Sequence, residues 1–258
     1  MNAIEKTLAM LEAVGGSDGG SSLAELSARV GVPKSTAHRI LQVLTEGRYV
    51  VPDGKGSYQP GPALVALAGN VFGGLQFARP ARTAVLSLRE KTGHTVHLAI
   101  RNGDRAIYVD KAEADRPYQM VSRVGMSIPL HCTAIGKAIL SSLPEAEMRS
   151  LLSSAGLERR TPQTLTSVAD VLADIKGVRR RGYAVDNEEN EAGVRCVGAA
   201  IFNSIGDVVG AVSISALTFL LSPGKVDEAG SAVRAAAADI SATFGAAAQR
   251  ETMRDSRR

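Results

Sequence analysis

Residues 31–48 read Gly-Val-Pro-Lys-Ser-Thr-Ala-His-Arg-Ile-Leu-Gln-Val-Leu-Thr-Glu-Gly-Arg, and this stretch decides the fold of the N-terminal part of the chain. Pro33 suits the first position of a helix, where its missing N–H would have no partner anyway. Apolar side chains recur at helical spacing and predict one buried stripe of Ala37, Ile40, Leu41 and Leu44. The other side carries hydrogen-bond donors, namely Lys34, Ser35, His38, Arg39 and Gln42. Two interpretations follow: a DNA recognition helix, or an ordinary amphipathic helix with a polar outer face.

The segments before this helix predict two more helices. Asn2 and Ser22 each stand three residues before a glutamate, which is the spacing of a capping box. In the first helix the apolar positions form a stripe of Ile4, Leu8, Leu11 and Val14. The second helix is short and closes at Gly31, directly before the Pro33 helix. Two short helices joined by a tight glycine-containing turn form a helix-turn-helix, whose second helix normally enters the major groove.

The segment after the helix predicts a β-hairpin. Residues 49–51 and 57–60 are rich in aromatic and β-branched side chains, and they flank a turn that contains Asp53-Gly54. A hairpin in this place is the wing of a winged helix-turn-helix, with Lys55 at its tip in reach of a phosphate. The order of these pieces favours the DNA interpretation over the ordinary amphipathic helix.

The composition is that of a folded protein. The chain has 258 residues, of which 45% are hydrophobic. No stretch approaches about 18 uninterrupted apolar residues, and the N-terminus does not resemble a signal peptide, so we expect no membrane span. With only Cys132 and Cys196, neither a disulfide framework nor a four-cysteine metal site is expected. The sequence therefore predicts a reduced, cytoplasmic protein without a metal ion or cofactor.

The net charge of +4 is only a weak indication of an anionic partner. Residues 1–77 are neutral overall, because their lysines and arginines are matched by as many acidic residues. The case for DNA therefore depends on where the charges lie. Lys34 and Arg39 share one helix face with His38 between them.

Beyond the hairpin the pattern changes to a mixture of strands and helices. Strands are predicted at 96–101, 105–112, 183–186, 196–203 and 208–215, and helices at 80–92, 134–143, 144–156, 167–181 and 226–248. This mixture predicts an α+β fold with helices packed on an antiparallel sheet. We expect a winged helix-turn-helix domain at 1–61, a linker helix at 62–77 that is apolar on more than one side, an effector-binding domain at 78–250 and a flexible tail at 251–258.

The stretch His131-Cys132-Thr133-Ala134-Ile135-Gly136-Lys137-Ala138 carries the most suggestive chemistry of the second domain. A helix that starts at Ala134 presents unpaired amides and a positive dipole end, which would suit the carboxylate of a small acid. The alternative is an ordinary helix capped by Thr133. Gly136-Lys137 is not a phosphate loop, because Ala138 replaces the serine or threonine that would hold magnesium.

Other titratable residues leave further hypotheses open. An enzyme with an appended DNA-binding domain could use Cys196 or Cys132 as a nucleophile, and a redox sensor could pair the two, although no spacing supplies a base or a zinc site. His94 and His97 alternate in a strand-like run and are expected to be partly exposed or hydrogen-bonded within the fold. The acidic run 186–191 is expected to be largely a solvated loop, with Asp186 able to aim inward.

Three stretches together resemble the IclR family of bacterial transcriptional regulators, and the resemblance covers nearly the whole chain. They are Val-Pro-Lys-Ser-Thr-Ala-His-Arg-Ile-Leu at 32–41, Pro-Leu-His-Cys-Thr-Ala-Ile-Gly-Lys-Ala at 129–138, and residues 182–197. The resemblance implies a winged helix-turn-helix, a linker helix and a GAF-like effector domain. It also implies a homodimer, paired through the DNA-binding domains, or a homotetramer. A small organic or aromatic acid would alter the binding of double-stranded operator DNA.

These arguments lead to the hypothesis of a ligand-responsive transcription factor with two sets of site residues. The DNA-binding set is Lys34, Ser35, Thr36, His38, Arg39 and Lys55. The effector-binding set implied by the resemblance is Ala134, Ile135, Asp186, Cys196, Ser213 and Ser215, with Met120, Ile128 and Val194 as apolar walls. Ser213 and Ser215 are two apart in a strand and so face the same side. Ala134-Ile135 is bulkier than the glycine-alanine pair of some relatives that bind two- or three-carbon acids, which leaves the effector open.

Overall fold

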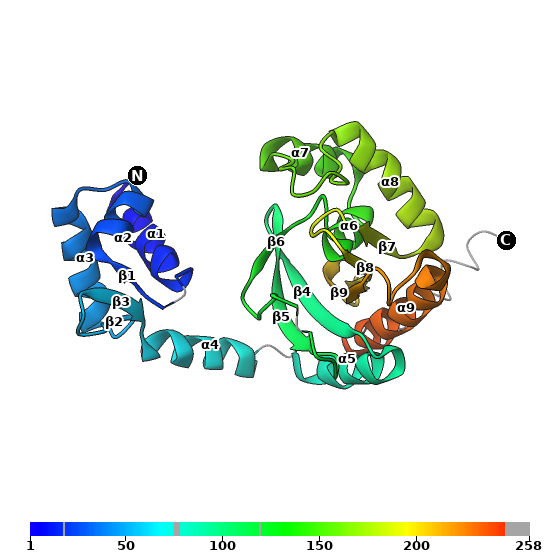
Figure 1. Ribbon diagram of the computed structural model, residues 1–258, viewed down its shortest axis with the longest axis horizontal. Coiled ribbons are helices and arrows are strands. Elements are labelled where there is room, and N and C mark those ends of the chain that lie inside the picture. Colours follow the sequence, from blue (N-terminus) through cyan, green and yellow to red (C-terminus); the bar gives the residue numbers. More distant parts are fainter. Residues whose placement is uncertain (18, 75–77, 119, 246–258) are drawn as a thin grey trace. The chain divides into compact units, whose positions relative to one another are not determined.

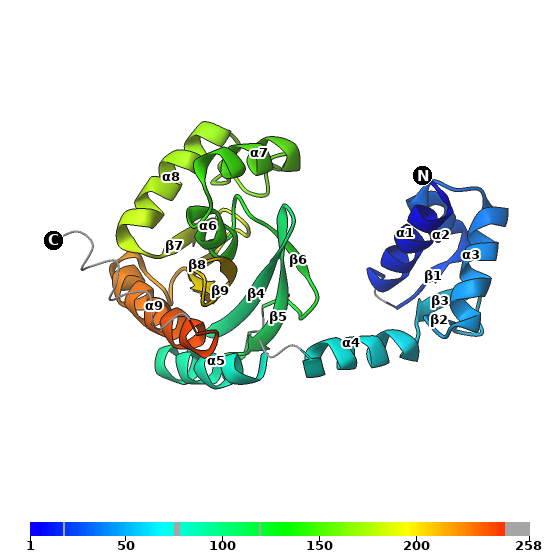
Figure 2. The same cartoon turned by 180° about the vertical axis from the view of Figure 1, so that it is seen from behind.

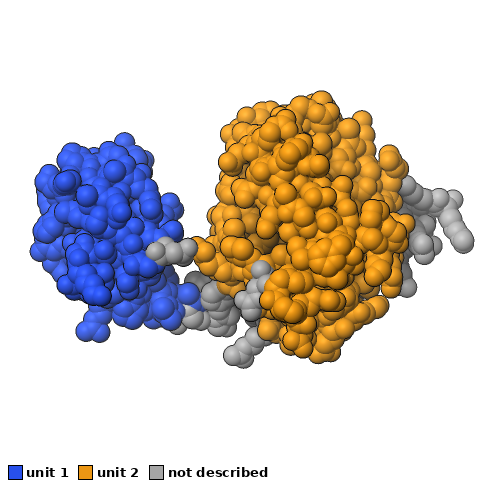
Figure 3. Space-filling view, viewed as in Figure 1, with its two compact units in different colours: residues 1–76 blue, residues 77–258 orange. Residues whose placement is uncertain are grey.

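The computed structural model describes residues 1–17, 19–74, 78–118 and 120–245 (Figure 1). The chain divides into two compact units, Met1–Gln76 and Phe77–Arg258 (Figure 3). Unit 1 has one hydrophobic core, and unit 2 has two, one on each face of its sheet. No helix of the described residues is long and apolar enough to cross a membrane.

Unit 1 is a winged helix-turn-helix. Its elements are α1 (Ala3–Gly15), β1 (Ser21–Ser22), α2 (Leu23–Val30), α3 (Lys34–Glu46), β2 (Val50–Pro52), β3 (Ser57–Pro60) and α4 (Pro62–Gly74). Both predicted capping boxes are present, Asn2 with Glu5 and Ser22 with Glu25. Gly31 ends α2 in the left-handed conformation, at a φ of 71°, as a C-terminal glycine commonly does. The wing is a three-stranded sheet in the order β1-β3-β2, and its β1 strand was not predicted.

Helix α3 has the predicted two faces, with one correction at its start. Pro33 is the N-cap, with ψ at 146°, and the helix begins at Lys34, so the proline lies one position earlier than expected. Ala37, Leu41 and Leu44 are buried in the core of unit 1, and Ile40 packs against them. The apolar stripe of α1 is different from the prediction, because Ile4 and Leu8 are exposed.

Unit 2 is built on one antiparallel sheet of six strands in the order β6-β5-β4-β9-β8-β7. The strands are β4 (Thr95–Asn102), β5 (Arg105–Ala112), β6 (Ser127–Pro129), β7 (Ala184–Asn187), β8 (Val194–Phe202) and β9 (Val208–Leu217). The helices are α5 (Ala78–Thr92), α6 (Ala134–Ser141), α7 (Glu145–Ala155), α8 (Val168–Arg181), the 3₁₀ turn η1 (Pro223–Lys225) and α9 (Val226–Thr243).

Helices cover both faces of this sheet (Figures 1 and 2). α5 and α9 pack on the face that carries Val96, Val212 and Ile214. α6, α7 and α8 form the second core over the face that carries Ala99 and Ala211. The two-residue period of a strand separates these sets, so each long strand contributes to both cores.

The predicted element types in unit 2 are confirmed, and most boundaries agree within two residues. Strand β6 was not predicted. The predicted helices at 62–77 and 226–248 are seen as α4 and α9 up to Gly74 and Thr243. Residues 75–77, the end of the predicted effector domain and the predicted tail at 251–258 lie outside the described residues.

Two glycines let α6 approach its neighbours closely. A Cβ atom added at Gly136 would lie 2.3 Å from Leu130 Cα, and one added at Gly198 would lie 3.0 Å from the carbonyl carbon of Ala134. The backbone at the start of α6 therefore rests directly on β8 and on the segment after β6. Only glycine permits the approach at Gly136, and at Gly198 a larger residue would require the backbone of Ala134 to shift.

We expect Gly136→Ala to lower the free energy of unfolding by about 2 kcal/mol or more, because the added methyl group meets backbone that cannot move aside. Gly177→Ala is the matched control. Its Cβ would first meet the Arg181 guanidinium at 3.1 Å, a flexible side-chain end, and alanine favours the helix by up to about 1 kcal/mol. Urea unfolding of both variants measures the difference, and equal stability would contradict the close packing of α6.

Candidate DNA interface and effector site

The outer face of α3 is free to meet a partner. Lys34, Ser35, His38 and Arg39 are exposed, and Thr36 at the edge of this face is half-buried. Within the described part of the chain, neither Lys34 nor Arg39 has an ion-pair partner. The face therefore presents cations and hydroxyls without local neutralisation, as a surface that meets phosphates and base edges requires.

The tip of the wing is ordered by Asp53. Its Oδ1 accepts hydrogen bonds from the backbone N–H of Lys55 at 2.8 Å and of Ser57 at 2.9 Å. These bonds hold the pKa of the Asp53 carboxyl below its usual value. The turn leaves the Lys55 side chain exposed, which suits contact with a phosphate.

In unit 2 the strand register gathers four of the predicted effector residues on one face of the sheet. Asp186 pairs with Cys196, and Cys196 pairs with Ser215 on the next strand. Ser213 stands between Gly198 of β8 and His97 of β4. Cross-strand neighbours lie about 5 Å apart, so these residues form two adjacent rows of polar side chains, which we call the polar rows.

His97 joins the polar rows to the loop between β5 and β6. The ring is buried, and its Nε2 lies 2.6 Å from Ser122 Oγ, while Nδ1 lies 3.3 Å from Ser215 Oγ. It also stacks on the ring of Tyr108, with centroids 4.7 Å apart. Burial, aided by the charge of Lys111, lowers the pKa of His97 to about 3. The imidazole is therefore neutral at physiological pH.

A lysine fastens the same loop to the sheet. Lys111 Nζ donates to the carbonyl oxygens of Met120 at 2.9 Å and Ser122 at 2.8 Å, and it pairs with Glu113 at 2.7 Å. Met120, one of the predicted apolar walls, is therefore held through its backbone carbonyl by Lys111. The other two predicted walls, Ile128 on β6 and Val194 on β8, are both buried.

The N-terminus of α6 lies over the polar rows. Thr133 is the N-cap, as predicted, and its Oγ1 accepts the N–H of Gly136 at 3.0 Å. The amides of Ala134 and Ile135 are in the first turn, so they have no acceptor within the helix. Because Ala134 rests on Gly198, which lies in one of the polar rows, these amides and the hydroxyls of Ser213 and Ser215 belong to one region.

The acidic run 186–191 is only partly solvated, because Asn187 and Glu191 are exposed, whereas Asp186 aims inward, as the sequence allowed, and Glu189 is buried. Glu189 is buried and its Oε1 lies 2.6 Å from Nζ of Lys137, which is itself only 1% exposed. Asp174 of α8 lies 2.8 Å from the same ammonium group. Asp186 is buried as well, and its Oδ1 accepts the N–H of Glu189 at 2.8 Å.

Asp186 is the group in the polar rows that titrates near neutral pH. Burial first, and then the charge of Glu189, raise the pKa of Asp186 to about 7. A protonated carboxyl can donate a hydrogen bond, whereas a carboxylate only accepts. The side chain can therefore face an anionic group without two adjacent negative charges.

The two cysteines are not activated. Burial raises the pKa of Cys132 to about 12, and burial raises the pKa of Cys196 well above its ordinary value. Nearby Asp186 acts in the same direction on both thiols. A catalytic or redox-sensing cysteine needs a lowered pKa, so this environment does not favour either cysteine hypothesis. No cluster of possible metal ligands occurs among the described residues.

The structure adds three residues to those that the sequence predicted: His97, Tyr108 and Lys137. Strand periodicity could place His97 on the same face as Thr95, but nothing local connects it with Ser215, which is 118 residues away. The sequence shows Lys137 only in a Gly-Lys pair that does not form a phosphate loop. Its role depends on Glu189 and Asp174, which come from other elements.

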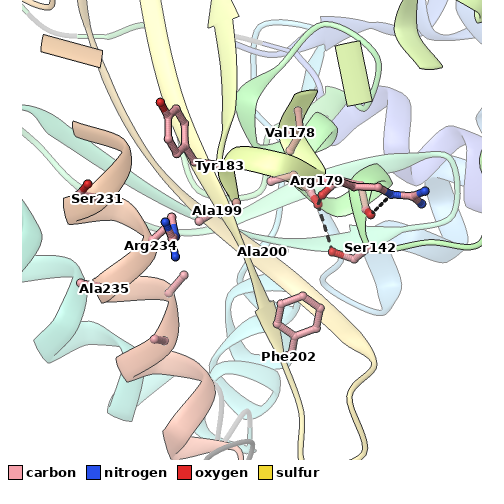
Figure 4. Close-up of a pocket in the computed structure, with 15 residues that line it drawn as sticks. Ser142, Val178, Arg179, Tyr183, Ala199, Ala200, Phe202, Ser231, Arg234 and Ala235 are labelled. Atoms are coloured by element: carbon pink, nitrogen blue, oxygen red, sulfur yellow. Dashed lines mark hydrogen bonds between the residues drawn. The ribbon is translucent and has the colours of Figure 1, made fainter. Parts of the chain in front are cut away.

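A separate hollow of about 680 Å³ lies between α6, α8, β8 and α9 (Figure 4). Small apolar side chains such as Ala199 and Ala200 line it, together with Tyr183 and Arg234. It shares no residue with the predicted effector set. We therefore do not assign the effector to this hollow.

Comparison with known proteins supports the same division. A model of the bacterial transcriptional regulator IclR C-terminal domain matches residues 70–242, and one of the IclR helix-turn-helix domain matches residues 3–54. The chain is 34% identical over 251 residues to the HTH-type transcriptional repressor AllR of Escherichia coli (strain K12). This alignment covers 94% of this chain and 90% of that protein.

Solved structures share the whole architecture. The crystal structure of the Thermotoga maritima IclR has a TM-score of 0.73 and 33% identity, covering 95% of this chain and 99% of that chain. An IclR homolog from Microbacterium hydrocarbonoxydans, complexed with 4-hydroxybenzoate, has a TM-score of 0.81 over 95% of this chain and 100% of that chain. Its identity is only 20%, so this second likeness concerns the fold alone.

The raised pKa of Asp186 predicts a pH dependence of stability. The folded chain keeps this proton where the unfolded chain has lost it, so the contribution is complete below about pH 4 and is lost as the pH rises toward 7. Through this group the wild type should lose about 2–4 kcal/mol of its free energy of unfolding between pH 4 and pH 7. Asp186→Asn keeps the acceptor for the Glu189 N–H but does not titrate, so we expect it not to show this loss.

Urea unfolding between pH 4 and 8 measures this difference between Asp186→Asn and the wild type. Asp207→Asn removes one negative charge from an exposed hairpin and serves as the control. Parallel pH profiles for Asp186→Asn and the wild type would show that Asp186 ionises in the folded chain as it does in the unfolded one.

Proposed function

The chain belongs to the IclR family of bacterial transcriptional regulators, and we propose that its affinity for operator DNA depends on an organic acid bound at the polar rows of unit 2. It is a DNA-binding transcriptional regulator with a winged helix-turn-helix. The observation that carries the proposal is the strand register, which brings Asp186, Cys196, Ser213 and Ser215 together beneath the N-terminus of α6.

For DNA, we assign base and phosphate contacts in the major groove to the exposed face of α3. Lys34, Ser35, Thr36, His38 and Arg39 supply donors at the spacing of one helix face, and Lys55 of the wing supplies a phosphate contact. Residues 1–61 would form the DNA-binding domain and residues 62–77 the linker.

For the effector, we assign a small carboxylic acid. The first-turn amides of α6, the hydroxyls of Ser213 and Ser215, and a protonated Asp186 are donors suited to a carboxylate. Ile128, Val194 and Met120 would close around the hydrocarbon part, in the manner of a pocket with few polar groups. The Microbacterium homolog is complexed with 4-hydroxybenzoate, which is an acid of this class.

A homodimer would bury the apolar side chains that unit 1 leaves exposed. Ile4 is 73% and Leu8 56% exposed one turn apart on α1, and Val65 is 73% and Leu67 53% exposed on α4. Exposed apolar groups of this size mark surfaces that meet a partner. We propose pairing of two copies through unit 1, in the cytoplasm, with a homotetramer as the alternative assembly. The family is one of regulators rather than enzymes, and we propose no cofactor and no metal.

Arg39→Ala tests the DNA face. If Arg39 contacts a base, the variant loses about 1–3 kcal/mol of operator affinity, roughly 5- to 150-fold. The measurement is fluorescence anisotropy with an operator selected in vitro by the purified full-length protein. Arg149→Ala removes the same charge from an exposed position on α7 and should bind normally. Unchanged affinity in Arg39→Ala would count heavily against the assignment.

Ser213→Ala tests the effector site. In a thermal-shift screen of glyoxylate, pyruvate, 4-hydroxybenzoate and similar acids, we expect at least one acid to raise the melting temperature, because a ligand of the folded state stabilises it. Ser213→Ala should weaken that acid about tenfold or more while leaving operator binding intact, since a hydrogen bond to a charged group is lost.

Ser154→Ala is the control, because its hydroxyl bonds to Leu151 on α7, away from the polar rows. A stabilising acid that binds Ser213→Ala and wild type equally would place the effector elsewhere. A catalytic activity that the wild type shows and Cys196→Ala lacks would instead support the enzyme hypothesis.

A further inference from the structure

A second cavity lies on the opposite face of the sheet from the polar rows. It has a volume of about 500 Å³ and is bounded by the end of α5, the start of α9 and the segment that joins β9 to α9. Its apolar lining is Ile214, Leu220, Leu221, Ala229 and Ala232. Ile214 stands between Ser213 and Ser215 on β9 and points the other way, so the cavity is separate from the proposed effector site.

Cationic side chains from three segments line this cavity. Lys91 comes from α5, Arg116 from the loop after β5, and Lys225 from the turn before α9. Within the described part of the chain none of the three has an ion-pair partner. Glu228 is the acidic residue in the lining. The cavity therefore carries an excess of positive charge.

His94 supplies a separate observation that points to a ligand. Its Nδ1 is buried and has no hydrogen-bond partner. A buried polar atom without a partner costs free energy, and such atoms in folded proteins need an explanation. Burial first, and then the charges of Arg116 and Lys225, lower the pKa of His94.

We propose that this cavity binds an amphipathic organic anion, a carboxylate attached to a hydrocarbon body. The carboxylate would lie among Lys91, Arg116 and Lys225. The hydrocarbon would cover the apolar floor of Ile214, Leu221 and Ala232. The His94 ring also lines the cavity and would offer its unpartnered Nδ1 to the same carboxylate. The volume is in the range of small-molecule sites.

The combination of charge and apolar surface defines the ligand class. An inorganic anion would leave the apolar floor uncovered, and a neutral hydrocarbon would leave the cations and His94 Nδ1 without partners. We therefore expect a small anion or a hydrocarbon alone to bind more weakly than a molecule that contains both groups. In the joined molecule the second group binds without a further loss of translational freedom.

Three probes separate these contributions in isothermal titration calorimetry of the full-length protein: octanoate, octan-1-ol and acetate. We expect octanoate to bind at least about tenfold more tightly than either of the other two. The double variant Arg116→Ala/Lys225→Ala should lose at least about tenfold in octanoate affinity. Both side chains are exposed, so the variant should fold. Arg149→Ala is the charge control and should bind octanoate normally.

A second double variant, Ser213→Ala/Ser215→Ala, distinguishes the two sites. It should keep octanoate binding, and the ¹⁵N resonance of the His94 ring should shift on titration in both this variant and the wild type. Equal affinity for octanoate and octan-1-ol, binding that survives in Arg116→Ala/Lys225→Ala, or binding abolished by the serine variant would each overturn the proposal. None of these outcomes bears on whether α3 binds DNA.

Discussion

The ion pairs of Lys137 hold together the parts of unit 2 on which the proposed effector site depends. A buried ammonium group is tolerated only with close partners, and here Glu189 and Asp174 provide them from a loop and from α8. Such a cluster adds little net stability, because desolvation offsets most of the attraction. Its effect is on geometry. Lys137 lies one turn into α6, so the cluster fixes the start of that helix relative to the 187–193 loop, and through Glu189 it fixes Asp186.

The charges around Lys137 are compatible with the proposal that an organic acid binds nearby. Three carboxyl groups, those of Asp174, Glu189 and Asp186, lie around a single ammonium group, and the pKa values of Glu189 and Asp186 are both raised by burial first. Glu189 is paired with the ammonium group at 2.6 Å, which favours its charged form, so we take Asp186 as the carboxyl group that holds a proton. With Asp186 protonated and His97 neutral, the polar rows present donors without a permanent charge. The dipole of α6 then supplies the attraction for a carboxylate.

Local sequence patterns predicted most helices and strands, but they could not predict contacts between residues that are distant in the chain. The capping pairs Asn2–Glu5 and Ser22–Glu25, the cap at Thr133 and the glycine at 182 each set a helix end by interactions within a few residues. By contrast, Glu189 looked solvated because nothing near it in the chain reveals Lys137, 52 residues away. The prediction of an apolar stripe on α1 was incomplete for another reason. The helical spacing shows that Ile4 and Leu8 share an apolar face, but it does not show whether this chain or a partner buries that face.

The same sheet limits how an acid bound at the proposed site would act on DNA binding. The polar rows are in unit 2 and the α3 face is in unit 1, and α4 and α5 are the helices through which the chain passes from one unit to the other. α5 packs through Ala81, Val85 and Leu88 on the sheet face that carries Val96 and Leu98 of β4. His97 lies between those two residues and points to the other face. A ligand that draws on Ser213 or Ser215 therefore acts on a strand whose opposite side supports α5. Such a ligand can alter DNA binding only if it binds more tightly to one conformation of β4, β9 and α5 than to another.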